Sequence, residues 1–220
     1  EIVAVKVVNP QANTVTVARG LLDTVPVAHP AGARLWFAEG VEALITEQYL
    51  SGESVQVKLL PSTGQGRLAE SAASADSHTF ANRMSRPYPP GNVKVNGSAW
   101  PKVIVGALSI SWAHRDRMQQ TAYLVSQTEG HIGPEAGVTY TVRCYNENNA
   151  LQKTVTGLTS ASWVYALADE SAESGFGRIN GKLKVEIEAV RDGLVSWQKQ
   201  TRSVERAGYG LNYGKTYGGA

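Results

Sequence analysis

The chain has 220 residues and a formal net charge of only +2 at pH 7, so it is long enough for one large or two ordinary domains, each with its own core. Its 21 basic and 19 acidic residues are interspersed rather than clustered. This pattern argues against the concentrated basic face that nucleic-acid binding normally requires. No apolar run of about 18 residues is present, so we expect no membrane span.

The beginning of the chain lacks both a methionine and the pattern of a signal peptide. Glu1 leads directly into a strand-like run, without a charged segment followed by an apolar one. We therefore expect the sequence to be a fragment or a processed product of a longer protein.

The first strands are predicted from apolar, β-branched runs and from alternation. Residues 2–8 are stopped by Asn9-Pro10, and residues 14–17 alternate cleanly, which predicts a hairpin. Further strands are expected at residues 34–37 and 54–60.

Two stretches before residue 85 have no clear period. Residues 40–52 fit either one helical face or a twisted strand. Residues 66–82 are rich in Ala and Ser, and we interpret them as a loop that contains one helical turn. Because the surrounding elements are strands, we expect a β-rich, barrel-like domain over residues 1–85.

Three prolines within four positions interrupt the chain in the stretch Arg86-Pro87-Tyr88-Pro89-Pro90-Gly91-Asn92. Proline fixes φ and removes a backbone donor, and the residue before each proline is pushed toward extended geometry. Neither a helix nor a central strand is expected to run through such a segment. The stretch predicts a stiff spacer, residues 86–100, between two domains. A long loop inside one domain is the alternative.

The second half carries about seven short strands over roughly a hundred residues, which predicts an antiparallel β-sandwich over residues 101–206 and an all-β fold class. The clearest strand has Leu183, Val185 and Ile187 on one face. Arg191-Asp192-Gly193 after it is a strong hairpin signal. Trp112 closes an alternating strand, so we expect it in the core. The expected strands cover residues 103–105, 108–112, 138–145, 153–158, 162–167, 183–189 and 195–204.

No set of residues predicts a metal, a cofactor or a catalytic nucleophile. The four histidines are scattered, without the short and regular spacing of zinc ligands. No Gly-x-Ser-x-Gly elbow is present, and Gly64-Gln65-Gly66 lacks the full spacing of a phosphate loop. The histidines are His29, His78, His114 and His131.

Two further candidates for catalysis have simpler explanations. Glu186 and Glu188 face the same side of one strand, as two catalytic carboxylates would, but Lys182 and Lys184 share that side, and a solvent-exposed polar face explains all four. Cys144 is the only cysteine, so no internal disulfide is available. It lies in an alternating pattern and is expected to be a small buried hydrophobe. We therefore do not expect an enzyme.

Aromatic residues remain as candidates for contact with a ligand or partner. Trp112 and Trp163 fall on expected core positions, whereas Trp100 and Trp197 lie near polar or spacer residues and remain candidate contact residues. In the C-terminal tail, residues 207–220, Tyr-Gly recurs every four residues, and glycine at this density forms no strand or helix by itself. The tail is expected to be flexible or to order against a partner through Tyr209, Tyr213 and Tyr217.

The second half resembles a fibronectin type III module. Residues 108–112 are similar to the second strand of such a module, with its buried tryptophan, and residues 140–142 are similar to the third. The run from 189 to 196 resembles the end of the sixth strand and the turn that follows. The chain departs from the family at Leu183, where Tyr is frequent, and in a long insertion over residues 116–137.

The first half resembles a segment of tailed-phage tail-tip or baseplate hub proteins, in which Arg-Gly, then Thr, then His-x-x-Gly-Ala recur. Here these are Arg19-Gly20, Thr24 and the stretch His29-Pro30-Ala31-Gly32-Ala33. The order of hub domain, proline-rich spacer, fibronectin-like module and Gly/Tyr-rich tail is similar to the C-terminal portion of large phage tail proteins.

The phage resemblance implies a structural protein of the virion, at the phage tail tip, without catalytic residues. It also implies a homo-oligomer, a trimer, in contact with other tail or baseplate proteins, and a host surface glycan or receptor as a further partner. Two other functions fit the residues. One is a carbohydrate-binding or adhesive module, and the other is an accessory fibronectin-like fragment of a secreted glycoside hydrolase.

Overall fold

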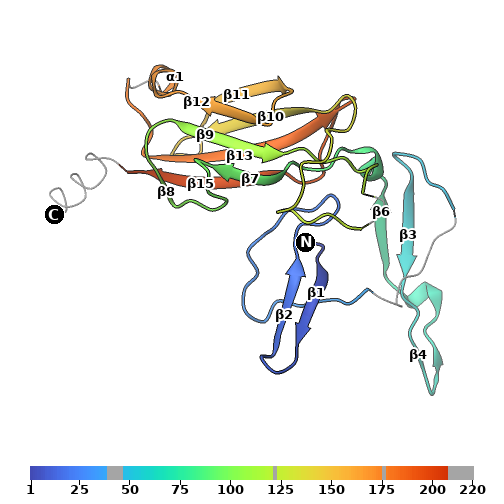
Figure 1. Cartoon of the computed structure of the whole chain (residues 1–220). Coiled ribbons are helices and arrows are strands. Elements are labelled where there is room, and N and C mark those ends of the chain that lie inside the picture. Colours follow the sequence, from blue (N-terminus) through green and yellow to red (C-terminus); the bar gives the residue numbers. More distant parts are fainter. Residues whose placement is uncertain (39–46, 121–122, 175–176, 208–220) are drawn as a thin grey trace, which may run out of the picture. The chain divides into compact units, whose positions relative to one another are not determined.

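The computed structural model describes residues 1–38, 47–120, 123–174 and 177–207, and it is built mainly of β-strands (Figure 1). The all-β class predicted from the alternation is confirmed. The chain divides into two compact units. The first unit consists of Glu1–Ala28 and Arg86–Ala220, and the second consists of His29–Ser85.

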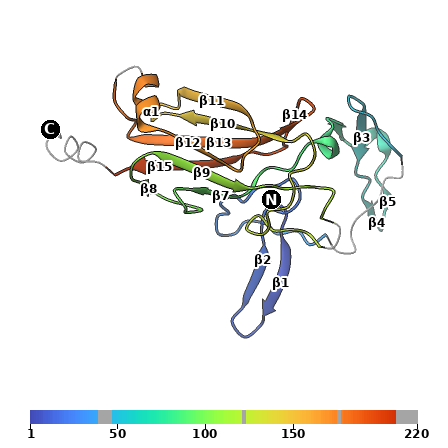
Figure 2. The same ribbon diagram turned by 45° about the horizontal axis from the view of Figure 1, so that its top comes forward.

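Two sheets form the sandwich of the first unit (Figure 2). One has the strand order β12-β9-β7, and the other has the order β11-β10-β13-β15-β8, with β14 added to β13. Without the two-residue strands β8 and β14, the sandwich has seven strands. The first, second and fifth of them (β7, β9 and β12) form one sheet, and the other four (β10, β11, β13 and β15) form the sheet that faces it. This is the arrangement of a fibronectin type III-like sandwich. The strands are β7 (Gly91–Val95), β8 (Val103–Ile104), β9 (Leu108–Ala113), β10 (Thr139–Tyr145), β11 (Leu151–Leu158), β12 (Ser162–Tyr165), β13 (Lys182–Arg191), β14 (Leu194–Val195) and β15 (Gln200–Arg206). A short helix, α1 (Leu167–Glu173), follows β12.

The core lies between the two sheets because the facing sides of their strands are apolar. Trp112 is buried as predicted and shares this core with Val142 and Ile187. Its ring meets that of Tyr140 edge-on, with centroids 5.2 Å apart. Cys144 is also fully buried, as expected, and burial is the main reason that its pKa rises to about 12. A thiol with such a pKa is protonated at neutral pH and unreactive.

The predicted turn after β13 is confirmed. Asp192 and Gly193 have φ values of 51° and 75°, and β13 pairs with β14 across them. Positive φ at both central residues is what a tight hairpin turn of this kind requires.

The proline-rich segment is not a spacer in the structure. Pro87, Pro89 and Pro90 are buried, and β7 begins directly after them and pairs with β9. The predicted spacer, residues 86–100, is therefore the entry to the sandwich and its first strand. The prolines end at Pro90, so the backbone donors from Gly91 onward are free to pair, and β7 lies at the edge of its sheet.

The predicted hairpin at the start of the chain forms from β1 (Ala4–Asn9) and β2 (Thr14–Ala18), but it belongs to the same unit as the sandwich. The long insertion connects the two. The amide of Gln127 donates to the Arg19 carbonyl at 2.8 Å, and the Gln127 carbonyl accepts from the Asn92 amide at 2.7 Å. Gly20 permits this approach, because it has φ +60° and an added Cβ would lie 2.9 Å from Cβ of Gln127. The expected single domain over residues 1–85 is thus divided.

The second unit consists of small open sheets. β3 (Ser54–Lys58) pairs with β6 (Ala75–Thr79), and β4 (Ser62–Thr63) pairs with β5 (Gly66–Arg67). In the described residues these pairs are two-stranded and do not close into the barrel-like form that we expected. Two 3-10 turns complete the unit, η1 (Glu70–Ala72) and η2 (Arg83–Ser85).

Two predictions for this unit differ from the structure, and a third is tested only in part. Residues 34–37 form no strand, because they have no strand beside them among the described residues. β6 lies in the stretch that we expected to be a loop. Its sequence Ala-Asp-Ser-His-Thr has no apolar alternation, so no strand was predicted there. Of the ambiguous residues 40–52, residues 40–46 lie outside the described residues and 47–52 form neither helix nor strand.

Candidate interaction surfaces

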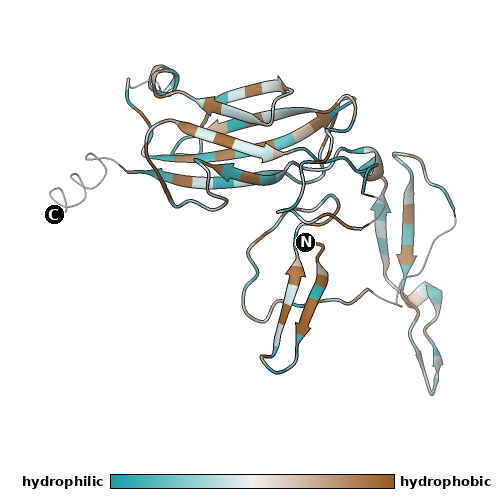
Figure 3. Ribbon diagram, in the orientation of Figure 1, coloured by the Kyte–Doolittle hydropathy of each residue, from teal (hydrophilic) through white to brown (hydrophobic). Residues whose placement is uncertain are grey.

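The β1–β2 hairpin carries an uncovered apolar face. Its register pairs Val5 with Val17 and Val8 with Val15, and a bulge between Val5 and Val7 brings both pairs to the same side. We call these four residues, Val5, Val8, Val15 and Val17, the valine face. Three of them, Val5, Val8 and Val15, are 48–60% exposed, and hydrophobic stretches are visible on both strands in Figure 3. A lone two-stranded hairpin is marginally stable in water, and its exposed apolar face is a candidate contact surface.

The second unit has no core among its described residues, 29–38 and 47–85, because none of them is buried. A compact domain of about 60 residues normally removes about 60% of its surface from water. Its rings at Tyr49 and Phe80 stack with centroids 4.7 Å apart, but many large apolar side chains face outward. Contiguous exposed apolar surface is typical of interaction sites, so these side chains are candidate contact residues. The exposed side chains include Leu35, Trp36, Phe37, Leu50, Leu59 and Met84.

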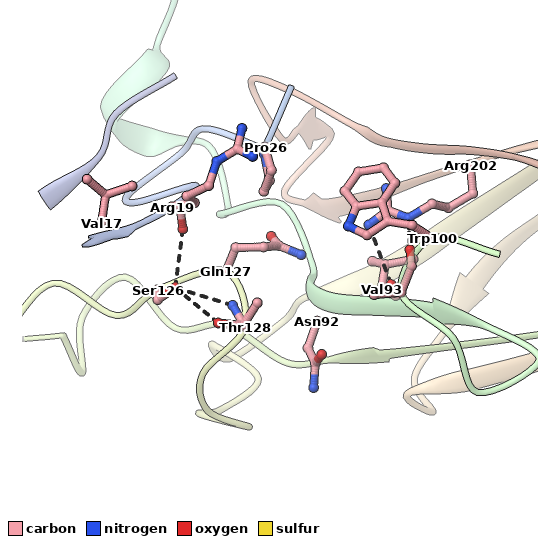
Figure 4. Close-up of a pocket in the computed structure, with 11 residues that line it drawn as sticks. Val17, Arg19, Pro26, Asn92, Val93, Trp100, Ser126, Gln127, Thr128 and Arg202 are labelled. Carbon is pink, nitrogen blue, oxygen red and sulfur yellow. Dashed lines mark hydrogen bonds between the residues drawn. The ribbon is translucent and has the colours of Figure 1, made fainter. Parts of the chain in front are cut away.

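An open pocket of about 220 Å³ lies in the first unit, beside Trp100 (Figure 4). Trp100 and Arg202 form one side of it, and the guanidinium carbon of Arg202 lies 3.8 Å from the centroid of the Trp100 ring. Arg19, Ser126, Gln127 and Thr128 line the other side. The Trp100 side chain is 60% exposed, so the structure places this predicted contact residue at the rim of a pocket.

A chain of buried polar groups underlies the pocket. Arg202 Nη1 donates to Gln200 Oε1 at 3.2 Å, and Gln200 Nε2 donates to Gln127 Oε1 at 2.6 Å. None of these three residues was predicted from the sequence to be buried near a site, because polar side chains are normally exposed. A signal was available, since Gln200 and Arg202 lie on the same inward face of β15 as Val204.

The other predicted contact residues are not brought to this pocket. Trp197 lies between β14 and β15, is partly exposed, and has the Arg86 guanidinium 5.7 Å from its ring centroid. Tyr209, Tyr213 and Tyr217 lie outside the described residues.

The two glutamates of β13 are not on a solvent-exposed face, contrary to our expectation. Glu186 is only 7% exposed and Glu188 only 8%, because cationic side chains cover them. Burial pushes the pKa of Glu186 upward, but hydrogen bonds to its carboxylate, first of all from Lys199 at 2.6 Å, outweigh this and hold the pKa below its usual value. Arg143 pairs with Glu188 at 2.7 Å. Both carboxylates therefore serve in ion pairs.

Two histidines that are distant in sequence meet at the edge of the core. The rings of His114 and His131 have centroids 4.5 Å apart, and His114 Nδ1 lies 2.7 Å from the Tyr140 hydroxyl oxygen. Within the described ranges, no group of three or more His, Cys, Asp or Glu residues is placed to hold a metal ion. In the same residues, no helix has the length and apolar character needed to cross a membrane.

The motif residues Arg19, Gly20 and Thr24 lie at the base of the hairpin. Arg19 donates from Nε and Nη2 to the two carboxylate oxygens of Glu1, at 2.9 and 2.5 Å. Thr24 Oγ1 accepts from the Ile2 amide at 3.1 Å and donates to the Leu21 carbonyl at 2.7 Å. These residues act structurally here.

Comparisons with known proteins add little to this geometry. No protein-family model and no curated protein sequence matches the chain. Among solved structures, an Fn3-like protein from Clostridium thermocellum is similar, with 14% sequence identity and a TM-score of 0.31, over 56% of this chain and 95% of that one. Similarity at this level supports no argument about function. The assignment of a fibronectin-like sandwich therefore rests on the strand order described above.

Proposed function

We propose that the chain is a structural component of a phage or prophage tail tip, where it acts as a scaffold in the virion and performs no catalysis. The observation that supports this most is the apolar surface that the chain leaves uncovered. Three of the four residues of the valine face are exposed, and the second unit has no buried residue among those described. Such surfaces gain stability when a neighbouring chain covers them, as in an assembly.

The strand pairing supports the same proposal. In the described residues β3 pairs only with β6, and β1 only with β2, so each pair leaves unpaired backbone groups along its outer edges. An additional strand from a neighbouring subunit can pair with such an edge through main-chain hydrogen bonds. We propose that the neighbours are further copies of this chain, as a trimer, and other tail or baseplate proteins.

The finer assignment to a phage tail tip draws on the sequence resemblance. Arg19, Gly20 and Thr24 are the residues that hold the hairpin base together, which gives the motif a physical reason to recur in proteins built in this way. The sandwich, which begins directly after the proline-rich segment, provides the rigid body that a scaffold role requires.

Hydrogen exchange tests the assembly role directly. In the isolated chain, amides of β3 and β6 are expected to exchange much faster than those of β10 and β13, because no core protects them. In intact particles the same amides should become protected. Equal protection of both regions in the isolated chain would contradict the need for a covering partner.

The location is tested on purified virions. Antibodies against the sandwich, residues 86–207, should label the distal tail end in electron micrographs, and peptides of the chain should be present in the same particles by mass spectrometry. Absence of the chain from purified particles would refute the tail assignment.

A second candidate function, glycan binding, is favoured by one observation, the exposed Trp100 beside an open pocket. It is compatible with the structural role, since a tail tip contacts a host surface.

A further inference from the structure

The pocket beside Trp100 has a ready-made platform for a flat apolar surface. Arg202 covers one face of the Trp100 ring, and most of the Trp100 side chain remains exposed. The volume of about 220 Å³ is below the ~300–1,000 Å³ of sites for drug-sized ligands. A single sugar unit fits such a space better than a nucleotide or a large cofactor does.

One hydrogen-bond donor in the pocket has no partner in the described part of the chain, and its orientation is fixed. Arginine only donates, so Gln200 must turn its oxygen to Arg202 and its amide nitrogen to Gln127. Gln127 must then accept with Oε1, which leaves its Nε2 without a hydrogen-bond partner in the described part of the chain. Gln127 is only 4% exposed, and in Figure 4 its amide end points toward the Trp100 side of the pocket. Although the residue as a whole is largely buried, Nε2 itself is open to the pocket, so a water or a ligand can accept its hydrogen bond there.

The electrostatic character of the pocket is positive. The hydrogen-bond partners of Arg202 in the described residues are all neutral oxygens, including the carbonyls of Ala99 and Thr201 at 2.8 Å. Burial lowers the pKa of Arg202 to about 10, so its guanidinium stays charged at neutral pH. Arg19 also lines the pocket, but its charge is paired with the Glu1 carboxylate, so the uncompensated positive charge is that of Arg202. Among the described residues, no aspartate or glutamate lines the pocket.

We propose that this pocket binds a saccharide and prefers a sugar that carries a carboxylate. The apolar face of the sugar ring stacks on the face of Trp100 that Arg202 leaves open, as sugar rings stack on aromatic side chains. An oxygen of the sugar accepts a hydrogen bond from Gln127 Nε2. The charge of Arg202, which no nearby carboxylate compensates, favours an acidic sugar over a neutral one. This site adds ligand binding to the scaffold role and rests on the pocket alone.

Glucuronic acid and glucose are suitable probes, because they differ only in a carboxylate at one carbon. Saturation-transfer NMR on the whole chain should show binding of glucuronate, with weaker binding of glucose. The difference between the two should shrink at high salt, since salt screens the attraction of the carboxylate. Equal affinity for both sugars would overturn the acidic preference, and binding of neither would overturn the site.

Substitutions assign the binding to this pocket. Trp100→Ala should weaken glucuronate binding by at least about tenfold, because it removes the stacking platform. Trp197→Ala is the matched control, since Trp197 is also partly exposed and also lies under an arginine, but does not line the pocket. Equal losses in the two variants would contradict the proposal.

A second variant tests the unpartnered donor. Gln127→Glu keeps the acceptor that Gln200 requires, removes the donor and adds a negative charge, so it should abolish glucuronate binding while the melting temperature stays near that of the parent. Unchanged binding would exclude the role of Gln127. Burial of Trp100 in intact particles, with no sugar binding by the isolated chain, would assign the pocket to a protein contact and overturn the proposal. The sugar-binding outcomes are measured on the isolated chain and do not depend on whether the chain is found in virions.

Discussion

Trp112 lies in the centre of the sandwich core, 5% exposed, with its ring against Tyr140. Replacing it with alanine should lower the free energy of unfolding by about 3–5 kcal/mol, the usual range for a buried large aromatic side chain. Its indole nitrogen is buried and has no hydrogen-bond partner among the residues that the structure describes. Trp112→Phe should therefore be much milder, about 1 kcal/mol, because it keeps most of the apolar contact and removes the unsatisfied donor. Urea unfolding measures both, and an alanine variant within about 1 kcal/mol of the parent would argue against this core.

His114 should make the sandwich sensitive to mild acid. Burial, followed by the positive charge of nearby His131, lowers the pKa of His114 below its usual value. The unfolded chain, with an ordinary pKa of about 6.5, then binds a proton more readily than the folded chain does. The stability that His114 contributes is complete above about pH 6.5 and is lost as the pH falls toward the lower folded pKa.

The measurement compares the free energy of unfolding at pH 7.5 and pH 5.5 in the parent and in His114→Asn. This interval lies above the ordinary pKa values of the carboxylates. The parent should lose more stability than the variant between the two pH values. An equal loss in both would show that His114 does not carry the effect.

At the scale of elements, helix α1 is held by a buried ion pair. The helix has only seven residues and no side-chain N-cap, so it depends on tertiary contacts. Glu170 is completely buried and pairs with Arg206 of β15, and its Oε1 accepts from the Asn180 amide at 2.8 Å. Glu170→Gln should destabilise the chain by about 3–5 kcal/mol, because it leaves Arg206 buried with an uncompensated charge.

An exposed ion pair provides the control for this prediction. Glu147 lies 3.9 Å from Arg178, and both side chains are well exposed. Glu147→Gln should change the free energy of unfolding by less than about 1 kcal/mol. If the two variants unfold at the same denaturant concentration, the buried pair does not hold α1 to the sheet.

At the scale of the whole molecule, stability and assembly should respond differently to the same substitution. Val8 and Val15 are exposed in this chain, and threonine keeps the β-branched shape that strands favour. Replacing both with threonine should change the stability of the isolated chain by no more than about 0.5 kcal/mol. The same variant should assemble less completely with its neighbours, measured by light scattering, because the valine face becomes polar.

Val7→Thr on the same strand is a suitable control, since Val7 is also exposed but pairs with Thr16 on the opposite face of the hairpin and so leaves the valine face intact. If the double threonine variant assembles as completely as the parent, the hairpin is not an assembly contact.

The sequence by itself determined the features that depend on neighbouring residues along the chain. Alternation located the strand that contains Leu183 and Ile187 and the strand that ends near Trp112. Side chains on the inner, apolar face of a strand recur every two residues, so such a strand is visible in the sequence. The turn at Asp192 and Gly193 was predictable because few residues adopt positive φ readily. The burial of Trp112 and Cys144 followed from the same alternation.

Only the tertiary structure decided which segments pair and which polar residues turn inward. β6 has no apolar period but gains its hydrogen bonds from β3, whereas residues 34–37 have the composition of a strand but pair with no strand in the described ranges. The inward face of β15 carries Gln200 and Arg202, whose burial depends on partners far away in sequence, Gln127 among them. A strand needs a partner that the chain brings from elsewhere, and a polar side chain can be buried only where distant groups complete its hydrogen bonds.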